Sequence, residues 1–184
     1  MFEASPPILV IVDVQQAIDH PMWGPRNNPN AEQVIAGLLD VWRTRGFPIV
    51  HVRHDSTEAD SAYRPDQPTH AFKAEAEPLV GEPVVAKSTN SAFIGTDLEA
   101  RLRALGGDVV YAGVITNNSL EATVRMSGNL GFRSFLVADA CWTVDTTDLT
   151  GRVWPAEDVH QLTLANLHGE YATVVTSAEV FSAL

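Results

Sequence analysis

The sequence predicts an α/β protein: a single three-layer, Rossmann-like domain in which helices cover both faces of a six-stranded, mainly parallel sheet. Short β-branched runs alternate with segments of helical periodicity along the 184 residues. The runs are apolar almost throughout, which is typical of strands covered on both faces. This length fits one domain, residues 1–184, and right-handed crossovers would connect its strands.

The first half of the chain supplies three strands, at residues 8–14 (ILVIVDV), 48–52 and 84–86. A helix is expected over 31–45, where apolar residues recur at helical spacing and Gly46 ends the run. A second is expected from the capping-box pattern Thr96-Asp97-Leu98-Glu99 to about Leu105. The remaining segments, 15–30 and 53–83, lack a sustained period and are expected to be irregular loops.

The second half is organised around residues 109–132. The apolar run VVYAGV predicts a strand, and the helical spacing that follows predicts a tight turn and then a helix that Ser119 opens. The other expected elements are a strand at 134–138, a polar loop at 142–154, a helix opened by Pro155 and a last strand at 172–176.

Composition excludes several classes of function. The net charge is −11, and the twelve lysine and arginine residues form no basic cluster, which argues against a nucleic acid or an anionic membrane as partner. The single cysteine, Cys141, excludes an internal disulfide and fits a reducing compartment. Because the N-terminus lacks a signal-peptide pattern and no apolar run reaches membrane-spanning length, we expect a cytoplasmic protein.

Three polar residues, Asp13, Lys87 and Ser119, stand at or just past the carboxyl ends of different predicted strands. Ligand sites in open α/β sheets lie at that edge, so the three side chains are expected to converge there. A carboxylate near a nucleophile can act as a general base, and a lysine favours negative charge on both. Two simpler interpretations stay open: Ser119 as a helix cap, and Asp13 with Lys87 as an ordinary ion pair.

The motifs that carry a family resemblance occur in order along nearly the whole chain: Asp13-Val14-Gln15, Lys87, Asn90-Ser91-Ala92-Phe93, Ala112-Gly113-Val114-Ile115-Thr116-Asn117, Thr123, Gly131-Phe132 and Asp139-Ala140. In these motifs the chain resembles the isochorismatase-like cysteine hydrolases. The resemblance implies a catalytic triad of Asp, Lys and Cys, which falls on Asp13, Lys87 and Ser119. It also implies a non-proline cis peptide at Val114–Ile115, an oxyanion hole formed by the N–H groups of Ile115 and Ser119, and a homo-oligomer.

A serine therefore stands where the family has its nucleophilic cysteine. We favour an engineered substitution, because serine is isosteric with cysteine and the surrounding residues fit a nucleophile site; a natural variant is the other explanation. A carboxylate is a weak base for a hydroxyl group, so this form is expected to be severely impaired.

The resemblance implies a hydrolase that cleaves a non-peptide C–N bond of a small amide, lactam or ureide. The segments Trp23-Gly24-Pro25-Arg26-Asn27-Asn28 and 87–97 resemble the streptothricin hydrolase-like branch, which suggests a cyclic amide. Two alternatives stay open: a vinyl ether hydrolase of the isochorismatase type that uses Asp13 as general acid, and a catalytically dead relative that binds a small ligand.

Other residues are candidates for lining the pocket. Trp23, Phe93 and Trp142 are candidates for its aromatic walls, and Asn90 and Asn117 for hydrogen bonds to substrate; packing and turn formation explain them equally well. Nicotinamidases of this superfamily bind a metal through Asp-x-His, but the matching stretch here is Val52-Arg53-His54. Neither a metal site nor a cofactor is therefore expected, and His51 and His54 are expected to be structural or to line the pocket. Cys141 is expected to be a packed thiol.

Overall fold

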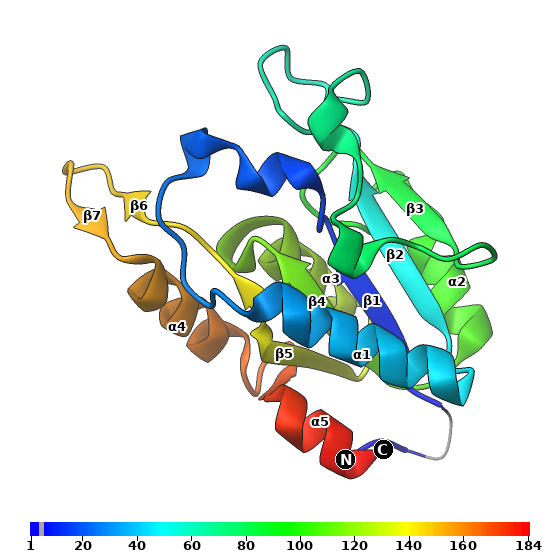
Figure 1. Ribbon diagram of the computed structural model, residues 1–184. Helices are drawn as coiled ribbons and strands as arrows, with labels where there is room; N and C mark the ends of the chain where they lie inside the picture. Colours follow the sequence, from blue (N-terminus) through cyan, green and yellow to red (C-terminus); the bar gives the residue numbers. More distant parts are fainter. Residues whose placement is uncertain (4–5) are drawn as a thin grey trace.

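In the computed structural model, which describes residues 1–3 and 6–184, a parallel sheet runs through the middle of the protein (Figure 1). In this part of the chain the sheet has six strands, in the order β3-β2-β1-β4-β5-β8, and every neighbouring pair is parallel. The strands are β1 (Ile8–Val12), β2 (Ile49–His54), β3 (Val84–Lys87), β4 (Val109–Val114), β5 (Ser134–Trp142) and β8 (Thr173–Val175). This confirms the predicted α/β class, and the sheet is fully rather than mainly parallel.

Helices cover both faces of the sheet. The α-helices are α1 (Ala31–Arg45), α2 (Leu98–Leu105), α3 (Glu121–Asn129), α4 (Ala156–Leu167) and α5 (Ser177–Ala183). Helices α1 and α5 pack on one face, in front of the sheet in Figure 1, and α2, α3 and α4 pack on the other. Strand β1 serves both cores, because Leu9 and Ile11 point to the first face while Val10 and Val12 point to the second.

Most predicted elements agree with the structure within a few residues. Helix α1 has the predicted bounds, and Gly46 caps it in the left-handed conformation with φ of 65°. The predicted first strand was too long, because the chain leaves the sheet at Asp13, whose φ is +55°. The predicted capping box at Thr96 does not form: Asp97 is the N-cap of α2, and the Thr96 hydroxyl donates to the Ala92 carbonyl instead.

The irregular segments contain short elements that the sequence did not predict. Four 3₁₀ turns lie in the loops, η1 (Gln16–Asp19), η2 (Pro21–Trp23), η3 (Pro68–His70) and η4 (Ala74–Ala76), and a small antiparallel pair, β6 (Thr146–Thr147) and β7 (Val153–Trp154), lies after the fifth strand. Helix α5 was also missed. It begins with a capping box in which the Thr176 hydroxyl accepts from the Glu179 N–H and the Glu179 carboxylate accepts from the Thr176 N–H.

The predicted fifth strand was too short, because β5 bulges in its middle. Tyr111 of β4 pairs with Leu136, but Gly113, only two residues on, pairs with Cys141. The register between β4 and β5 therefore shifts by the extra residues of β5, and the strand continues to Trp142.

None of the helices in residues 1–3 and 6–184 is both long enough and apolar enough to cross a membrane.

Candidate active site

The turn after β4 places Ser119. Residues Thr116–Leu120 form a π-helical turn, η5, that leads directly into α3, so the helix begins earlier and wider than the sequence indicated. The peptide bond between Val114 and Ile115 is cis, as the family resemblance implied. Ser119 is 9% exposed, and its carbonyl accepts a hydrogen bond of 2.7 Å from the Thr123 hydroxyl one turn further along.

Asp13 and Lys87 reach the same place from two other strands. Asp13 directly follows β1, and its N–H donates to the Val52 carbonyl of β2 at 3.0 Å, which fixes the backbone where the chain turns out of the sheet. Lys87 is the last residue of β3. Both side chains are almost fully buried, 3% and 2% exposed, so they form an ion pair inside the protein rather than at its surface.

Lys87 is the centre of the polar cluster. Its Nζ lies 2.6 Å from Asp13 Oδ2 and 3.3 Å from Ser119 Oγ, and it also reaches the Thr89 carbonyl at 3.0 Å and His54 Nδ1 at 3.2 Å. An ammonium group has three hydrogens to donate, so these four acceptors compete for them. The three residues that the sequence placed at strand ends are therefore in contact through the lysine.

Asp13 has one oxygen held by Lys87 and one left over. Burial raises the pKa of its carboxyl group, while the charge and hydrogen bond of Lys87 oppose that rise. Among residues 1–3 and 6–184, no group hydrogen-bonds Asp13 Oδ1, although the atom is buried. A buried carboxylate oxygen with an unused lone pair is suited to taking a proton from, or giving one to, a bound molecule.

Asp13 and Ser119 line a cavity of about 480 Å³, and Lys87, which contacts both, lies behind them. Its lining comes from the carboxyl ends of β1, β2 and β4, from the loop of residues 56–63 and from η2: Asp13, Met22, Trp23, His54, Ser56, Glu58, Ala59, Asp60, Ser61, Ala62, Tyr63, Asn90, Val114, Ile115, Asn118 and Ser119. This volume suits a small molecule.

The predicted pocket residues divide into two groups. Trp23 and Asn90 line the cavity, and so do Ile115 and Ser119, the residues expected to form an oxyanion hole. Phe93, Asn117 and Trp142 do not line it. Their contacts lie elsewhere: Phe93 stacks on Phe132 with ring centroids 6.0 Å apart, Asn117 accepts from the Thr143 hydroxyl, and Trp142 is fully buried beneath the guanidinium of Arg26.

Several lining residues were not predicted. Met22, Asn118 and the loop from Ser56 to Tyr63 carry no motif, and the loop lies in a segment without periodicity. Tyr63 is 8% exposed and packs edge-on against Trp23, with ring centroids 6.4 Å apart. In the sequence, the presence of this aromatic residue in an otherwise polar segment was the one signal that the loop folds back onto the domain.

The remaining histidines and the cysteine have structural partners. His51 Nε2 lies 2.8 Å from Glu82, and His70 Nε2 lies 2.8 Å from Asp55. Within the described residues, no three His, Cys, Asp or Glu side chains are grouped so as to hold a metal ion. Cys141 is fully buried, burial raises the pKa of its thiol to about 12, and it does not line the cavity.

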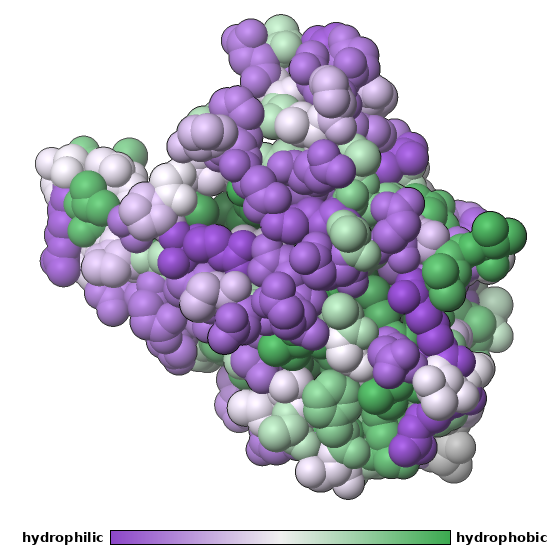
Figure 2. Space-filling view, in the orientation of Figure 1, coloured by the Kyte–Doolittle hydropathy of each residue, from purple (hydrophilic) through white to green (hydrophobic). Residues whose placement is uncertain are grey.

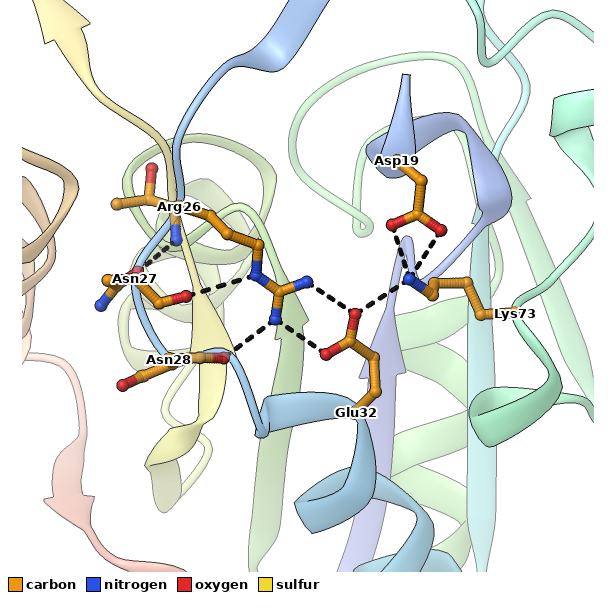
Figure 3. A network of polar contacts seen from close by, with 7 residues as sticks. Asp19, Arg26, Asn27, Asn28, Glu32 and Lys73 are labelled. Carbon is orange, nitrogen blue, oxygen red and sulfur yellow. Dashed lines mark hydrogen bonds and ion pairs between the residues drawn. The ribbon is translucent and has the colours of Figure 1, made fainter. Parts of the chain in front are cut away.

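A network of charged side chains fixes the loop that carries Trp23 (Figure 3). Glu32, at the start of α1, accepts two hydrogen bonds from Arg26, of 2.6 and 2.7 Å, and a third of 2.9 Å from Lys73. Lys73 also contacts both carboxylate oxygens of Asp19. The network thus ties residues 19–28 to α1 and to the segment that precedes η4.

The fold and the buried Asp–Lys–Ser cluster define a class: an α/β protein with a candidate hydrolytic site at the carboxyl edge of a parallel sheet. The Isochorismatase domain model matches residues 7–179, which is most of the chain. The protein therefore belongs to the isochorismatase family of hydrolases.

Individual relatives agree with this assignment. The crystal structure of a putative hydrolase of the isochorismatase family from Chromobacterium violaceum is 58% identical, with a TM-score of 0.94 over 99% of this chain and 95% of that one. The isochorismatase family protein YrdC of Bacillus subtilis is 37% identical over 95% of this chain and 94% of its own length. Nicotinamidase 3 of Arabidopsis thaliana is 36% identical over half of this chain and 41% of its own length.

Proposed function

We propose that the protein is built to hydrolyse a non-peptide C–N bond of a small amide, lactam or ureide. The observation that carries this proposal is the position of Lys87 Nζ, within hydrogen-bonding distance of both Asp13 and Ser119 beside a cavity of small-molecule size. The name of Nicotinamidase 3, an amide-cleaving relative, supports the same bond type.

The reaction would proceed through an acyl-enzyme on residue 119. A carbonyl carbon at the Ser119 end of the cavity is attacked by the side chain of residue 119, while Asp13 takes its proton. The N–H groups of Ile115 and Ser119 receive the carbonyl oxygen as it becomes negative. Asp13 then passes the proton to the departing amine, and a water molecule, deprotonated by Asp13, releases the acid and frees residue 119. Lys87 stabilises Asp13 while it is charged.

Ser119 limits this chemistry. A thiol next to Lys87 would be ionised readily, whereas a hydroxyl has a far higher pKa and its proton moves to a carboxylate unfavourably. We accordingly propose that the protein is impaired as an amidase in its Ser119 form. Ser119 is either a substitution for a cysteine or a natural variant.

The test is ammonia or amine release from a panel of small amides, lactams and ureides by this protein and by its Ser119→Cys and Ser119→Ala variants. The cysteine variant is expected to exceed the unchanged protein by roughly 100-fold or more, the usual scale of one catalytic group. Ser119→Ala, which has no nucleophile, is expected to be inert. Equal activity of all three forms would exclude an acyl-enzyme on residue 119.

A second candidate is cleavage of a vinyl ether with Asp13 as general acid. Its support is that burial raises the pKa of Asp13 and that Oδ1 has no partner, so a proton on this oxygen is available to a substrate. Isochorismate cleavage by this route needs no side chain at residue 119. It is expected to survive Ser119→Ala, which abolishes the amidase, whereas Asp13→Asn should abolish both reactions.

A third candidate is a ligand-binding protein without catalysis, which inactivity of every variant on both substrate types would favour.

We further propose a homo-oligomer in the reducing cytoplasm, supported by the family and by the single buried cysteine. Light scattering after size-exclusion chromatography measures the molar mass in solution, and the mass of a monomer would contradict the proposed homo-oligomer.

A further inference from the structure

All three charged residues that line the cavity are acidic: Asp13, Glu58 and Asp60. Lys87 neutralises Asp13, but within residues 1–3 and 6–184 no lysine, arginine or histidine forms an ion pair with Glu58 or Asp60. The arginine nearest to them in sequence, Arg64, is engaged at 2.9 Å by Asp66. Glu58 and Asp60 are exposed and have no ion-pair partner among the described residues, although the charge of Arg64 lies near enough to act on Asp60.

Hydrogen bonds within the loop of residues 56–63 fix the backbone that carries Glu58 and Asp60. The Ser56 N–H donates to the Tyr63 carbonyl at 3.1 Å and closes the loop. The Glu58 N–H donates to the Ser56 hydroxyl at 3.2 Å, and the Ser61 N–H donates to the Glu58 carbonyl at 3.2 Å. The loop stands at the top of the molecule in Figure 1, and this part of the surface is mostly hydrophilic in Figure 2.

An aromatic wall faces the same space. Trp23 and Tyr63 both line the cavity, and the Trp23 indole N–H is already used by the Ala17 carbonyl at 2.9 Å. Burial keeps the pKa of Tyr63 well above its ordinary value, so its ring stays a neutral phenol. Aromatic faces beside carboxylates attract organic cations through the ring quadrupole and through charge.

The buried part of the cavity lining is chemically different. There Asp13 and Ser119 are 3% and 9% exposed, and Asp13 Oδ1 has no hydrogen-bond partner among the residues that the structure describes. A molecule that spans the cavity therefore meets a reactive polar end and an acidic, aromatic end.

We propose that the preferred substrate is a small amide that carries a cationic group, an ammonium or guanidinium, which Glu58, Asp60 and the Trp23–Tyr63 wall receive while the scissile carbonyl lies at Ser119. This inference rests on the proposed amidase function for the reacting end only. It disfavours anionic substrates, because no lysine or arginine lines the cavity to receive a carboxylate.

The first experiment measures binding to the unchanged protein, independently of turnover. Pentylammonium, pentanol and pentanoate are of similar length and carry a cationic, a neutral and an anionic end group. Their affinities are measured by calorimetry at low salt. We expect the cation to bind at least about tenfold more tightly than the anion, and the difference to shrink at high salt. Equal affinities, or tighter binding of pentanoate, would overturn the inference even if the protein proves not to be an amidase.

The second experiment assigns the preference to the two acids. The variant Glu58→Gln/Asp60→Asn is compared with Asp40→Asn/Glu170→Gln, which removes the same charge at exposed sites outside the cavity lining. The first is expected to abolish the preference for pentylammonium, and the second to retain it. Loss of the preference in both variants would make the overall charge of the protein its cause, and retention in both would exclude Glu58 and Asp60; either result overturns the proposed site.

Turnover by the Ser119→Cys variant separates the two proposals. Primary amides of similar length that end in an ammonium, a methyl or a carboxylate group are compared by kcat/KM. Preference for the ammonium amide supports both proposals. Equal turnover of the three supports the amidase and overturns the cation inference, whereas inactivity on all three contradicts the amidase and leaves the binding experiment to decide.

Discussion

Lys87 Nζ lies 2.6 Å from Asp13 Oδ2, although 74 residues separate the two in the sequence. Parallel strands explain the contact: β1 and β3 flank β2 in the sheet, so their carboxyl ends open onto the same edge. Both side chains are almost fully buried, and an ion pair formed away from water depends on both partners being present.

The first prediction is that Lys87→Met destabilises the protein strongly. It leaves Asp13 buried without its counterion, and removal of one partner of a buried pair costs about 3–5 kcal/mol. The change is measured by urea unfolding at pH 7. The double variant Asp13→Asn/Lys87→Met, which removes both charges, should recover part of the loss. Arg101→Met, which breaks an exposed pair with Asp97, is the control and should change the unfolding free energy far less.

The second prediction concerns the ionisation of His54. Burial first, and the charge of Lys87 second, lower the pKa of this imidazole to about 4. Because Lys87 donates to Nδ1, the neutral ring carries its proton on Nε2. Nitrogen NMR should therefore show a neutral Nε2–H imidazole from neutral pH down to near pH 4.

This histidine also affects stability in a direction that can be checked. A folded-state pKa below the unfolded value means that protonation favours unfolding. The contribution of His54 is fully present above about pH 6.5 and is lost as the pH falls towards 4. The variant His54→Gln should show a weaker decline in unfolding free energy across this window than the unchanged protein. An identical decline would mean that the pKa of His54 is the same in the folded and unfolded states.

The sequence was sufficient to predict the polar cluster, because an apolar run followed by a polar residue can be recognised without knowledge of the structure. Asp13, Lys87 and Ser119 each follow a β-branched run, and in a parallel sheet such ends meet. Helix α1 was predicted with its observed bounds because a core-facing stripe and a terminal glycine, Gly46, are local signals, whereas the short helix α5 was missed.

The cavity lining was harder to predict, because it depends on the direction of side chains and on loop paths. Trp142 was expected in the wall, but the bulge in β5 brings it into register with Val114 and buries it. Tyr63 and Glu58 come from a segment without periodicity, and their positions follow from hydrogen bonds such as that between Ser56 and Tyr63. Contacts of this kind leave no regular pattern in a sequence.

The third prediction is that Glu32 stabilises the loop beside the cavity in a pH-dependent way. Burial alone would raise its pKa, but hydrogen bonds from Arg26 and Lys73 outweigh burial and hold the pKa at about 2. A depressed pKa stabilises the folded state above the unfolded value of about 4.5, and this contribution is lost as the pH falls towards 2. Its size at neutral pH is on the order of 3 kcal/mol.

Glu32→Gln should therefore lower the unfolding free energy at pH 7 by about 2–3 kcal/mol and have little effect near pH 2. Urea unfolding at several pH values measures both. Glu99→Gln, on an exposed helix face, is the matched control and should change stability by less than about 0.5 kcal/mol. Because the network holds residues 19–28, the Glu32 variant should also speed proteolysis of this loop. Equal losses in the two variants would show that the network adds nothing beyond a surface pair.

The fourth prediction concerns Gly113, the residue of β4 that lies beside the last residue of β1. A Cβ atom at this position would lie 2.1 Å from the Val12 carbonyl oxygen and 2.7 Å from the Val12 nitrogen, and the glycine has a φ of +129°. Gly113→Ala must therefore push β1 and β4 apart immediately before Asp13, and we expect a loss of about 4 kcal/mol or more. Gly151→Ala shares a positive φ but meets nothing within 4 Å, so it should cost only about 1 kcal/mol. Thermal unfolding of the two variants measures the difference in stability. In the Ser119→Cys background, amide turnover should fall when Gly113→Ala is added and should be unchanged when Gly151→Ala is added. Equal stability of the two variants would mean that β1 and β4 can separate without cost, and the close approach of these strands would then not be what positions Asp13.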